Sequence, residues 1–390
     1  MKKTMKRICC LALALVMLLS LAACGKGNSS GGASGAASGS GGKTPEATPA
    51  PEYVYAATFK PLVENTKEWV NARYYTGDGL YYTKYEKVGE REHGDQLPRW
   101  EGEFDVYATF LYYLDNKGTT TKVEAYSTLP PVENVENRRE FNSSADLLGI
   151  CFNDDGFVTV EVIYNSWNEG DGSEALYSED YWANLKYEQL YYIRWFDKEG
   201  NELSCAPIEV AQDGWLDAYK MVLDDKGNVL VTEGQKLRAI GPDGSDAYTI
   251  RTEGSIDGVV RMPDGRIAAV IYGDQQLLCF LDSDSGKFKD GVAVNFDTYN
   301  AVPGSGDYDF YYTNGSNFYG YKIDSGEEKL FNWINCDVNA ANSSVLGVDA
   351  DGTVHCLINT WNNKDQNKLL YFCKWIRVRR THHGFCLWLW

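Results

Sequence analysis

Five tryptophans are the residues of this sequence best suited to recognising a small ligand: Trp167, Trp182, Trp215, Trp333 and Trp361. A flat indole face can pack against the C–H surface of a sugar ring, although packing between strands is the competing interpretation for each. Trp167 and Trp182 flank a polar insertion, and binding residues concentrate on loops carried by a rigid scaffold. We therefore expect ligand stacking first at these two positions.

No group of residues shows the spacing of a catalytic, metal or cofactor site. Of the four histidines, His93 lies in an insertion, His355 in a strand pattern, and His382 and His383 near the end of the chain, so no Ser-His-Asp arrangement is credible. The run Asp282-Ser283-Asp284-Ser285-Gly286 weakly resembles a calcium loop but lacks the bidentate glutamate, which favours a plain hairpin turn. The sequence therefore predicts no catalytic residue, metal or cofactor. A propeller lyase or glycosidase is the alternative, because 55 acidic residues offer many carboxylate pairs that could hydrolyse a glycosidic bond.

The charge balance excludes one large class of partner. The chain has 37 basic and 55 acidic side chains and a formal charge of −18. Binding to nucleic acid needs clustered Lys and Arg, so no nucleic-acid partner is expected. The 27 tyrosines, 11 tryptophans and 38 glycines favour short strands and tight turns over helices.

A lipidation signal occupies the N-terminus. Four basic residues within positions 2–7 precede the apolar run Ile8–Leu19, which is shorter than the ~20 residues of a membrane span. The run leads to Leu21-Ala22-Ala23-Cys24, which resembles the bacterial lipobox; an ordinary secretory signal is the alternative. We expect residues 1–23 to be removed and Cys24 to carry the acyl chains. Residues 24–51, rich in Gly, Ser and Pro, then read as a disordered linker.

A β-hairpin unit recurs through residues 52–373. Each unit has an apolar strand, a turn with Gly, and a second strand; glycine supplies the positive φ that such turns need. The turn glycines are Gly79, Gly156, Gly227, Gly265, Gly315 and Gly352, with spacings of 77, 71, 38, 50 and 37 residues. A second turn follows most units, and propeller blades recur at roughly 40–50 residues. The pattern predicts an all-β, six-bladed β-propeller, with a pair of sheet sandwiches as the alternative.

Two irregularities have explanations within this pattern. The two long spacings require insertions, and polar stretches at Val88–Phe104 and Asn165–Tyr187 supply them inside the first two units. The last unit has only three clear strands, ending at Leu369–Cys373, while Tyr53–Phe59 is a spare strand before the first unit. Pairing this N-terminal strand with the last blade would close the ring and protect its edge.

Three segments carry a resemblance to a known family. They are Gly306-Asp307-Tyr308-Asp309-Phe310-Tyr311-Tyr312, Tyr319-Gly320-Tyr321 and Leu330-Phe331-Asn332-Trp333-Ile334-Asn335-Cys336-Asp337. With the lipobox and linker, residues 1–373 resemble the N-terminal propeller region of family 1 extracellular solute-binding lipoproteins of Gram-positive gut anaerobes. The resemblance implies a propeller followed by a carbohydrate-type solute-binding domain of an ABC importer. We expect no such domain within residues 1–390.

Residues 374–390 depart from the repeat. Lys374-Trp375-Ile376-Arg377-Val378-Arg379-Arg380 holds four basic residues in seven positions, and the chain then ends in Trp388-Leu389-Trp390. A shifted reading frame through the Trp375 and Ile376 codons would restore an Asp codon. We therefore interpret residues 374–390 as an aberrant tail that is a candidate frameshift product. A genuine basic tail for anionic lipid or teichoic acid is the alternative.

These observations give one expected function and its rivals. We expect a non-catalytic lipoprotein on the extracellular face of a Gram-positive cell membrane, anchored in lipid through Cys24. As the resemblance implies, its partners would be the permease or solute-binding domain of an ABC importer and a carbohydrate ligand. A free-standing surface propeller for glycan binding or adhesion is the first alternative, and a propeller enzyme is the second.

Overall fold

The fold is described from a computed structural model. The described residues are 53–61, 70–92, 103–132, 138–331, 343–348, 352–362, 367–381 and 384–385, less positions 116, 176, 212–213, 283–284, 305 and 315–316. Beyond His355 only the backbone is described, and all of these residues belong to the compact unit Pro51–Trp390. The expected signal peptide at 1–23 and linker at 24–51 lie outside the described residues.

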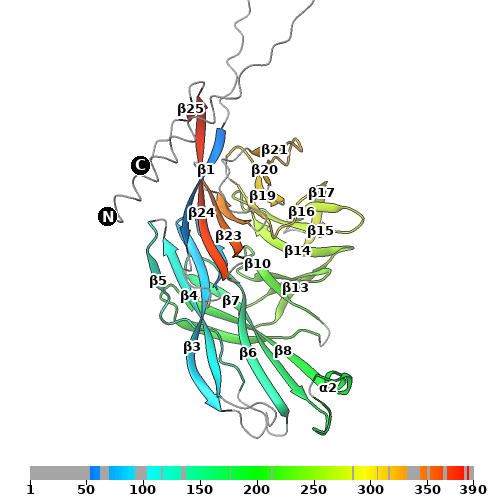
Figure 1. Cartoon of the computed structure of the whole chain (residues 1–390). Helices are drawn as coiled ribbons and strands as arrows, with labels where there is room; N and C mark the ends of the chain where they lie inside the picture. The colour runs from blue at the N-terminus through cyan, green and yellow to red at the C-terminus, as the bar shows by residue number, and fades with distance from the viewer. Residues whose placement is uncertain are drawn as a thin grey trace, which may run out of the picture. The chain divides into compact units, whose positions relative to one another are not determined.

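Five antiparallel sheets have four strands each, connected in chain order as meanders (Figure 1). Blade 1 contains β2 (Val70–Tyr75), β3 (Gly79–Glu92), β4 (Glu103–Asp115) and β5 (Thr120–Lys122). Blade 2 contains β6 (Arg139–Phe152), β7 (Gly156–Asn168), β8 (Leu185–Asp197) and β9 (Glu202–Ile208). Blade 3 contains β10 (Asp217–Leu223), β11 (Val229–Glu233), β12 (Lys236–Ile240) and β13 (Asp246–Arg251). Blade 4 contains β14 (Ser255–Arg261), β15 (Ile267–Tyr272), β16 (Gln276–Asp282) and β17 (Lys287–Ala293). Blade 5 contains β18 (Ala301–Pro303), β19 (Phe310–Asn314), β20 (Asn317–Tyr321) and β21 (Glu328–Phe331).

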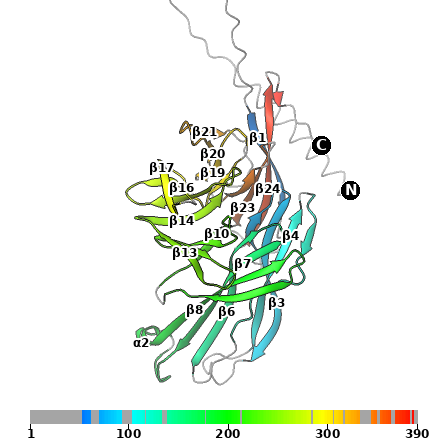
Figure 2. The ribbon, with the colours of Figure 1, turned by 180° about the vertical axis from the view of Figure 1, so that it is seen from behind.

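A further sheet, here called the terminal sheet, joins the two ends of the propeller region. Its strands are β22 (Ser343–Val348), β23 (Val354–Asn362), β24 (Asn367–Thr381), β1 (Tyr53–Pro61) and β25 (Gly384–Phe385). Strand β1 pairs antiparallel with β24 from Tyr53↔Arg379 to Pro61↔Tyr371, and the two strands lie side by side in Figures 1 and 2. Strand β24 thus continues past Cys373, where the sequence placed the end of the propeller, because β1 and β23 both pair with it beyond that residue.

The expected all-β propeller is confirmed, but five regular four-stranded blades are present where the sequence predicted six. One hairpin was also placed wrongly. The turn after Asn314 joins the second and third strands of blade 5, because β18 at Ala301–Pro303 precedes them as the innermost strand. A strand of three residues that includes a proline carries no alternating pattern by which a sequence could reveal it.

The innermost strand of each blade lies against the innermost strands of its neighbours. Strand β10 contacts β6 and β14, β18 contacts β14 and β22, and β2 contacts β6 and β22. Apolar side chains fill the space between adjacent blades; Val160 and Ile193 of blade 2, for example, pack in one cluster with Val229 of blade 3. Aliphatic β-branched residues suit this environment because they pack well on a pleated surface that is buried on both faces.

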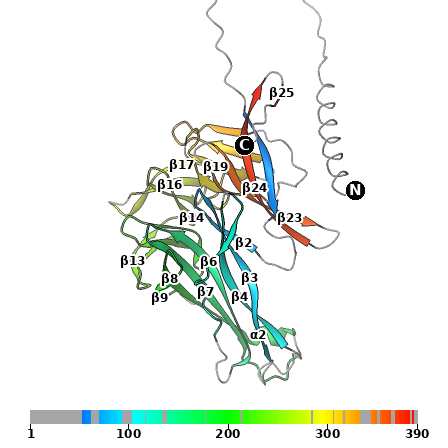
Figure 3. The same cartoon turned by 90° about the vertical axis from the view of Figure 1, so that its left-hand side faces the viewer.

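Blades 1 and 2 carry much longer strands than blades 3 to 5. The hairpin of β7 and β8 extends away from the inner strands and carries the short helix α2 (Glu179–Asn184) at its far end (Figures 1 and 3). The insertions expected at Val88–Phe104 and Asn165–Tyr187 therefore lengthen the middle hairpins of these two blades. Helix α2 is too short to cross a bilayer, and no helix among the described residues has the length and apolar character to do so.

Five of the six innermost strands are bulged. The register with the neighbouring strand shifts within β2, β6, β10, β14 and β22, as between Leu147 and Gly149 in β6. A β-bulge bends its strand and changes the direction of the following side chains. The bulges therefore determine which side chains of the inner strands face the centre of the propeller.

Candidate functional site

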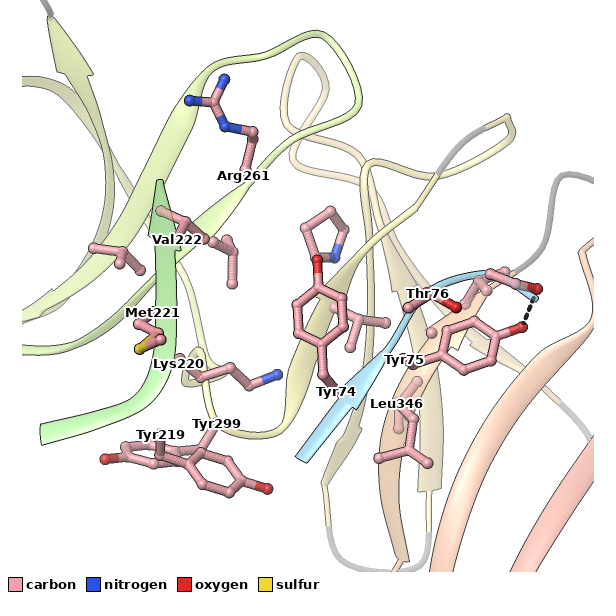
Figure 4. A pocket seen from close by; sticks show the side chains of 18 of the residues that line it. Tyr74, Tyr75, Thr76, Tyr219, Lys220, Met221, Val222, Arg261, Tyr299 and Leu346 are labelled. Carbon is pink, nitrogen blue, oxygen red and sulfur yellow. Dashed lines mark hydrogen bonds between the residues drawn. The ribbon is translucent and has the colours of Figure 1, made fainter. Parts of the chain in front are cut away.

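The innermost strands of all six sheets surround one central channel. It has a volume of about 480 Å³, and residues from β2, β6, β10, β14, β18 and β22 line it (Figure 4). Most of the lining residues are apolar, Ile150, Val260 and Val302 among them, and the polar ones include four tyrosines, Lys220 and Arg261. Ligand pockets typically have volumes of 300–1,000 Å³ and apolar walls with a few polar groups. The channel is therefore the candidate binding site of the propeller.

Lys220 is one of two cations in the wall of this channel. It lies on β10 between Tyr219 and Met221, and Figure 4 shows its side chain extending into the pocket towards Tyr74. Among the residues described, none accepts a hydrogen bond from Lys220 Nζ and none forms an ion pair with it. Burial lowers the pKa of Lys220 to about 8, although Asp297 and Asp257 oppose this shift through their negative charge. The amine is thus mostly protonated at neutral pH.

The two aspartates near Lys220 are engaged by other groups. The Asp257 carboxylate accepts hydrogen bonds from the Thr298 backbone N–H at 3.1 Å and hydroxyl at 3.3 Å. The Asp297 carboxylate accepts two hydrogen bonds from Asn300, at 2.7 and 2.9 Å. Burial, followed by the charge of Asp297, raises the pKa of Asp257 to about 6. The aspartates therefore act on Lys220 at long range without neutralising it in a direct pair.

The second cation of the channel wall, Arg261, has partners within the protein. Its guanidinium donates to the carbonyl oxygens of Leu223 at 2.6 Å and Gly265 at 3.1 Å. It also donates to the Asp225 carboxylate at 3.0 Å. These bonds connect the end of β14 to the β10–β11 turn. Arg261 therefore stabilises the fold, whereas Lys220 makes no such bond to a described residue.

Tyrosine rings supply the flat surfaces of the site. Tyr219 and Tyr299 both line the channel and stack on each other, with ring centroids 5.3 Å apart and an angle of 24° between the rings. Tyr219 is 39% exposed, so part of its ring is open to solvent. On the opposite side, Tyr75 lines the channel and stacks on the buried His355 at 4.4 Å. A partly exposed aromatic ring beside a cation suits a ligand that has both an apolar face and polar substituents.

Gly258 determines how closely β14 approaches Lys220. Its φ of +112° is a conformation that favours glycine, and an added Cβ would lie 2.9 Å from Lys220 Cβ. We expect Gly258→Ala to lower the free energy of unfolding by about 1–3 kcal/mol, because it adds backbone strain and a steric contact. Urea unfolding measures this, with Gly273→Ala as the matched control, since nothing lies within 4 Å of its added Cβ. Equal losses in the two variants would contradict the argument.

The expected tryptophan sites are not brought together. The side chains of Trp167, Trp182 and Trp215 are described, and none of the three lines the channel. Trp167 lies on β7, where the Arg138 guanidinium stacks 3.9 Å above its ring. Trp182 on α2 is 52% exposed and stacks on Tyr177 at 5.7 Å. Trp215 is 54% exposed.

For the other expected site residues, the structure describes the backbone, a turn or nothing at all. Cys24 and Trp333 lie outside the described residues, and only the backbone of Trp361 is described, in β23. Asp282 begins the β16–β17 turn, where its carboxylate accepts a hydrogen bond from the Ser285 hydroxyl at 2.8 Å. Within the described ranges, no cluster of three or more His, Cys, Asp or Glu side chains has the geometry of a metal site.

The sequence reasoning missed Lys220 and the tyrosines of the channel. One signal for Lys220 is visible in the sequence, since it is the charged residue within the run Ala218-Tyr219-Lys220-Met221-Val222-Leu223. Burying a charge within an apolar strand costs free energy unless the charge is paired, so such a residue is a candidate functional group. The tyrosines have no such signal, because they come from inner strands and connections far apart in the chain and meet only in the folded propeller.

The comparisons with known proteins leave the function open. No family model matches the chain, and no curated protein matches it. A protein of unknown function from Bacteroides caccae matches with 10% identity and a TM-score of 0.33, over 71% of this chain and 85% of that chain. Another, from Dyadobacter fermentans DSM 18053, matches with 11% identity and a TM-score of 0.44, over 83% of this chain and 97% of that chain.

Proposed function

We propose that this chain is a lipid-anchored surface protein whose propeller binds a carbohydrate-type solute in the central channel, without catalysis, as an accessory of an ABC importer. The observation that carries the proposal is the channel itself: an open space of about 480 Å³ with tyrosine rings in its wall and one cation, Lys220, that has no partner among the described residues. The lipobox at Cys24 and the linker support the location at the membrane. The resemblance of residues 1–373 to solute-binding lipoproteins supports the association with an importer.

We infer that the terminal sheet acts as a sixth blade that closes the propeller. Its strand β22 lines the channel together with the innermost strands of the five regular blades. Strand β22 also contacts β18 on one side and β2 on the other, which are the positions of neighbouring blades. By adding β1, the sheet obtains its fourth strand from the other end of the domain, and this removes an open edge at β24.

Anchoring in the membrane through Cys24 is tested with Cys24→Ser in the full chain, expressed in a Gram-positive host. We expect the unchanged chain in the membrane fraction and the variant largely in the medium, because one changed atom removes the acyl anchor. Metabolic labelling with a fatty-acid analogue provides the control, since label should enter only the unchanged chain. Equal membrane retention of the two chains would contradict lipidation at Cys24.

Ligand binding in the channel is tested with an oligosaccharide panel on the full Cys24→Ser chain. Leu346 lines the channel, so Leu346→Trp should narrow it and weaken binding at least tenfold. Leu203→Trp is the matched control, because Leu203 is 65% exposed on β9. Thermal unfolding of both variants confirms that they remain folded. Binding that survives Leu346→Trp unchanged would place the ligand elsewhere.

A free-standing glycan-binding or adhesion protein is the second candidate, and one observation favours it. Tyr177 and Trp182 form an exposed stacked pair at the end of the long β7–β8 hairpin, with 55% and 52% of their surfaces open. Tyr177 has a positive φ of 64°, which is uncommon for an aromatic residue. If this pair is the binding surface, Trp182→Ala abolishes glycan binding while Leu346→Trp leaves it intact.

A further inference from the structure

This inference rests on the proposed function and deepens it. We infer that the ligand of the channel carries a carboxylate, as an acidic sugar of the hexuronic-acid class does, and that Lys220 Nζ binds that carboxylate while the Tyr219–Tyr299 pair contacts the sugar ring. Three observations support this: no described residue pairs with the Lys220 ammonium group, Asp257 and Asp297 are bound by other residues, and the tyrosine surface beside Lys220 suits a sugar ring.

An unpaired ammonium group in a protein channel is costly. The part of the chain that the structure describes offers Lys220 Nζ neither a hydrogen-bond acceptor nor an ion-pair partner, and its side chain extends into the pocket (Figure 4). A buried charge loses its hydration and destabilises the fold unless another group compensates it. Arg261 has such compensation from Leu223, Gly265 and Asp225, whereas Lys220 does not. Lys220 is therefore arranged for an anion that comes from outside the chain.

The neighbouring aspartates set the strength of this site. Asp257 and Asp297 keep the amine protonated at neutral pH, yet their carboxylates are bound by Thr298 and Asn300. No described residue takes up the charge or the three N–H donors of Lys220, so we expect them to serve a ligand. A free anion is otherwise repelled by a chain of formal charge −18, so the site selects anions that also make apolar contacts.

The surface beside Lys220 determines what those apolar contacts are. Tyr219 precedes Lys220 in β10, and its stacked partner Tyr299 lines the same channel. Figure 4 shows the two rings on the Lys220 side of the pocket. A pyranose ring has an apolar C–H face that packs on tyrosine, and a hexuronic acid carries its carboxylate at the ring edge. A single acidic sugar can therefore reach both features of the site.

The pH dependence of binding follows from the groups around Lys220. Asp257 and Asp297 act on the Lys220 charge, and the other titratable or charged residues that line the same channel are Tyr74, Tyr75, Tyr219, Arg261 and Tyr299. Asp257 in turn is affected by the charge of Asp217 on β10 and accepts a hydrogen bond from the Tyr272 hydroxyl on β15. Lys220 loses its proton as the pH rises through about 8, so affinity for a carboxylate falls above that pH. Asp257 becomes charged as the pH rises through about 6, which also weakens anion binding. Affinity should be highest below pH 6.

The test compares a galacturonic-acid trisaccharide with its methyl ester, which has the same size and no charge. The full Cys24→Ser chain should bind the acid about 10- to 100-fold more tightly than the ester, as expected for a charge-assisted hydrogen bond. Lys220→Met should remove this preference. Lys226→Met is the matched control, because Lys226 is exposed in the β10–β11 turn, and it should leave the preference unchanged. Thermal unfolding shows whether Lys220→Met is folded, and loss of the preference above pH 8 in the unchanged chain provides a second readout.

The outcomes separate the inference from the function on which it rests. Equal binding of the acid and the ester, or a preference that survives Lys220→Met, overturns the inference and leaves a carbohydrate-binding propeller standing. Binding of neutral oligosaccharides alone has the same meaning. If no oligosaccharide of either kind binds to the folded chain, the proposed function fails as well.

Discussion

Replacing Glu161 with alanine is expected to lower the free energy of unfolding by about 3–5 kcal/mol, as removal of one partner from a buried ion pair does. Glu161 is fully buried on β7, and its carboxylate accepts hydrogen bonds from Arg194 at 2.9 and 3.1 Å. It also accepts from the Tyr126 hydroxyl at 3.1 Å and the Leu129 backbone N–H at 2.8 Å. The variant would leave a buried guanidinium with a reduced set of partners.

The position of this network explains why its loss matters. Tyr126 and Leu129 belong to the segment that connects blade 1 to blade 2, so Glu161 attaches that connection to the second strand of blade 2. Burial raises the pKa of Glu161, while Arg194 and the hydrogen bonds from Leu129 and Thr159 favour the charged form. Because so many donors converge on one carboxylate, no other side chain can replace it without leaving donors unsatisfied.

Urea unfolding measures the effect, with Glu202→Ala as the matched control. Glu202 pairs with Arg194 from the other side, but its side chain is 41% exposed, so its loss should cost about 1 kcal/mol or less. The double variant Glu161→Leu with Arg194→Met should recover part of the loss by removing both charges. Equal losses for Glu161→Ala and Glu202→Ala would show that the buried pair contributes nothing beyond a surface pair.

Ending the chain after Cys373 is expected to destabilise the propeller by about 3–9 kcal/mol. Of the nine register pairs between β1 and β24, the six from Tyr53↔Arg379 to Thr58↔Lys374 involve residues after Cys373. An antiparallel ladder has about one hydrogen bond per residue pair, and each contributes roughly 0.5–1.5 kcal/mol net. Strand β1 would lose most of its partner, and β23 would lose its pairing to Lys374 and Trp375.

Thermal unfolding and size-exclusion chromatography of the shortened chain provide the measurement. A chain that ends after Thr381 is the control, because it keeps all of β24 and should unfold as the full chain does. We expect the chain ending at Cys373 to unfold earlier and to associate through its exposed edge. If it matches the control, residues 374–390 are dispensable, as expected of an aberrant tail. If it unfolds early, these residues are part of the fold, whatever reading frame produced them.

The hairpin turns could be predicted because their chemistry is local. In the β10–β11 turn, the Asp224 carboxylate accepts hydrogen bonds from the backbone of Lys226 and Asn228, and Gly227 has a φ of +79°. Not every turn glycine serves this purpose. A Cβ at Gly156 would lie 2.0 Å from the Phe196 carbonyl oxygen, so this glycine is required by the close approach of β8 and not by its φ.

The inner strands could not be predicted in the same detail, because they follow no simple alternation. A bulge shifts the alternation of side chains by one residue, so a residue that the sequence pattern assigns to the space between blades can face the channel instead. Strand β18 is too short to carry a pattern at all. The channel exists only after strands from all six sheets converge. No local pattern in the sequence therefore marks Lys220 and Tyr299 as neighbours, whereas tryptophans beside an insertion are visible from the sequence alone.

The pairing of β1 with β24 has a consequence for the order of folding. Tyr53 and Arg379 are 326 positions apart (379 − 53), so this pairing closes the longest loop in the described chain. In a flexible chain such a loop costs about 4 kcal/mol more entropy than a four-residue hairpin. The intervening blades reduce that cost if they fold first and hold the two ends near each other. The terminal sheet should therefore form last, as a slow step that follows the synthesis of the final strand. Until then β1 is a free edge, and any delay at that stage exposes the chain to association with its copies.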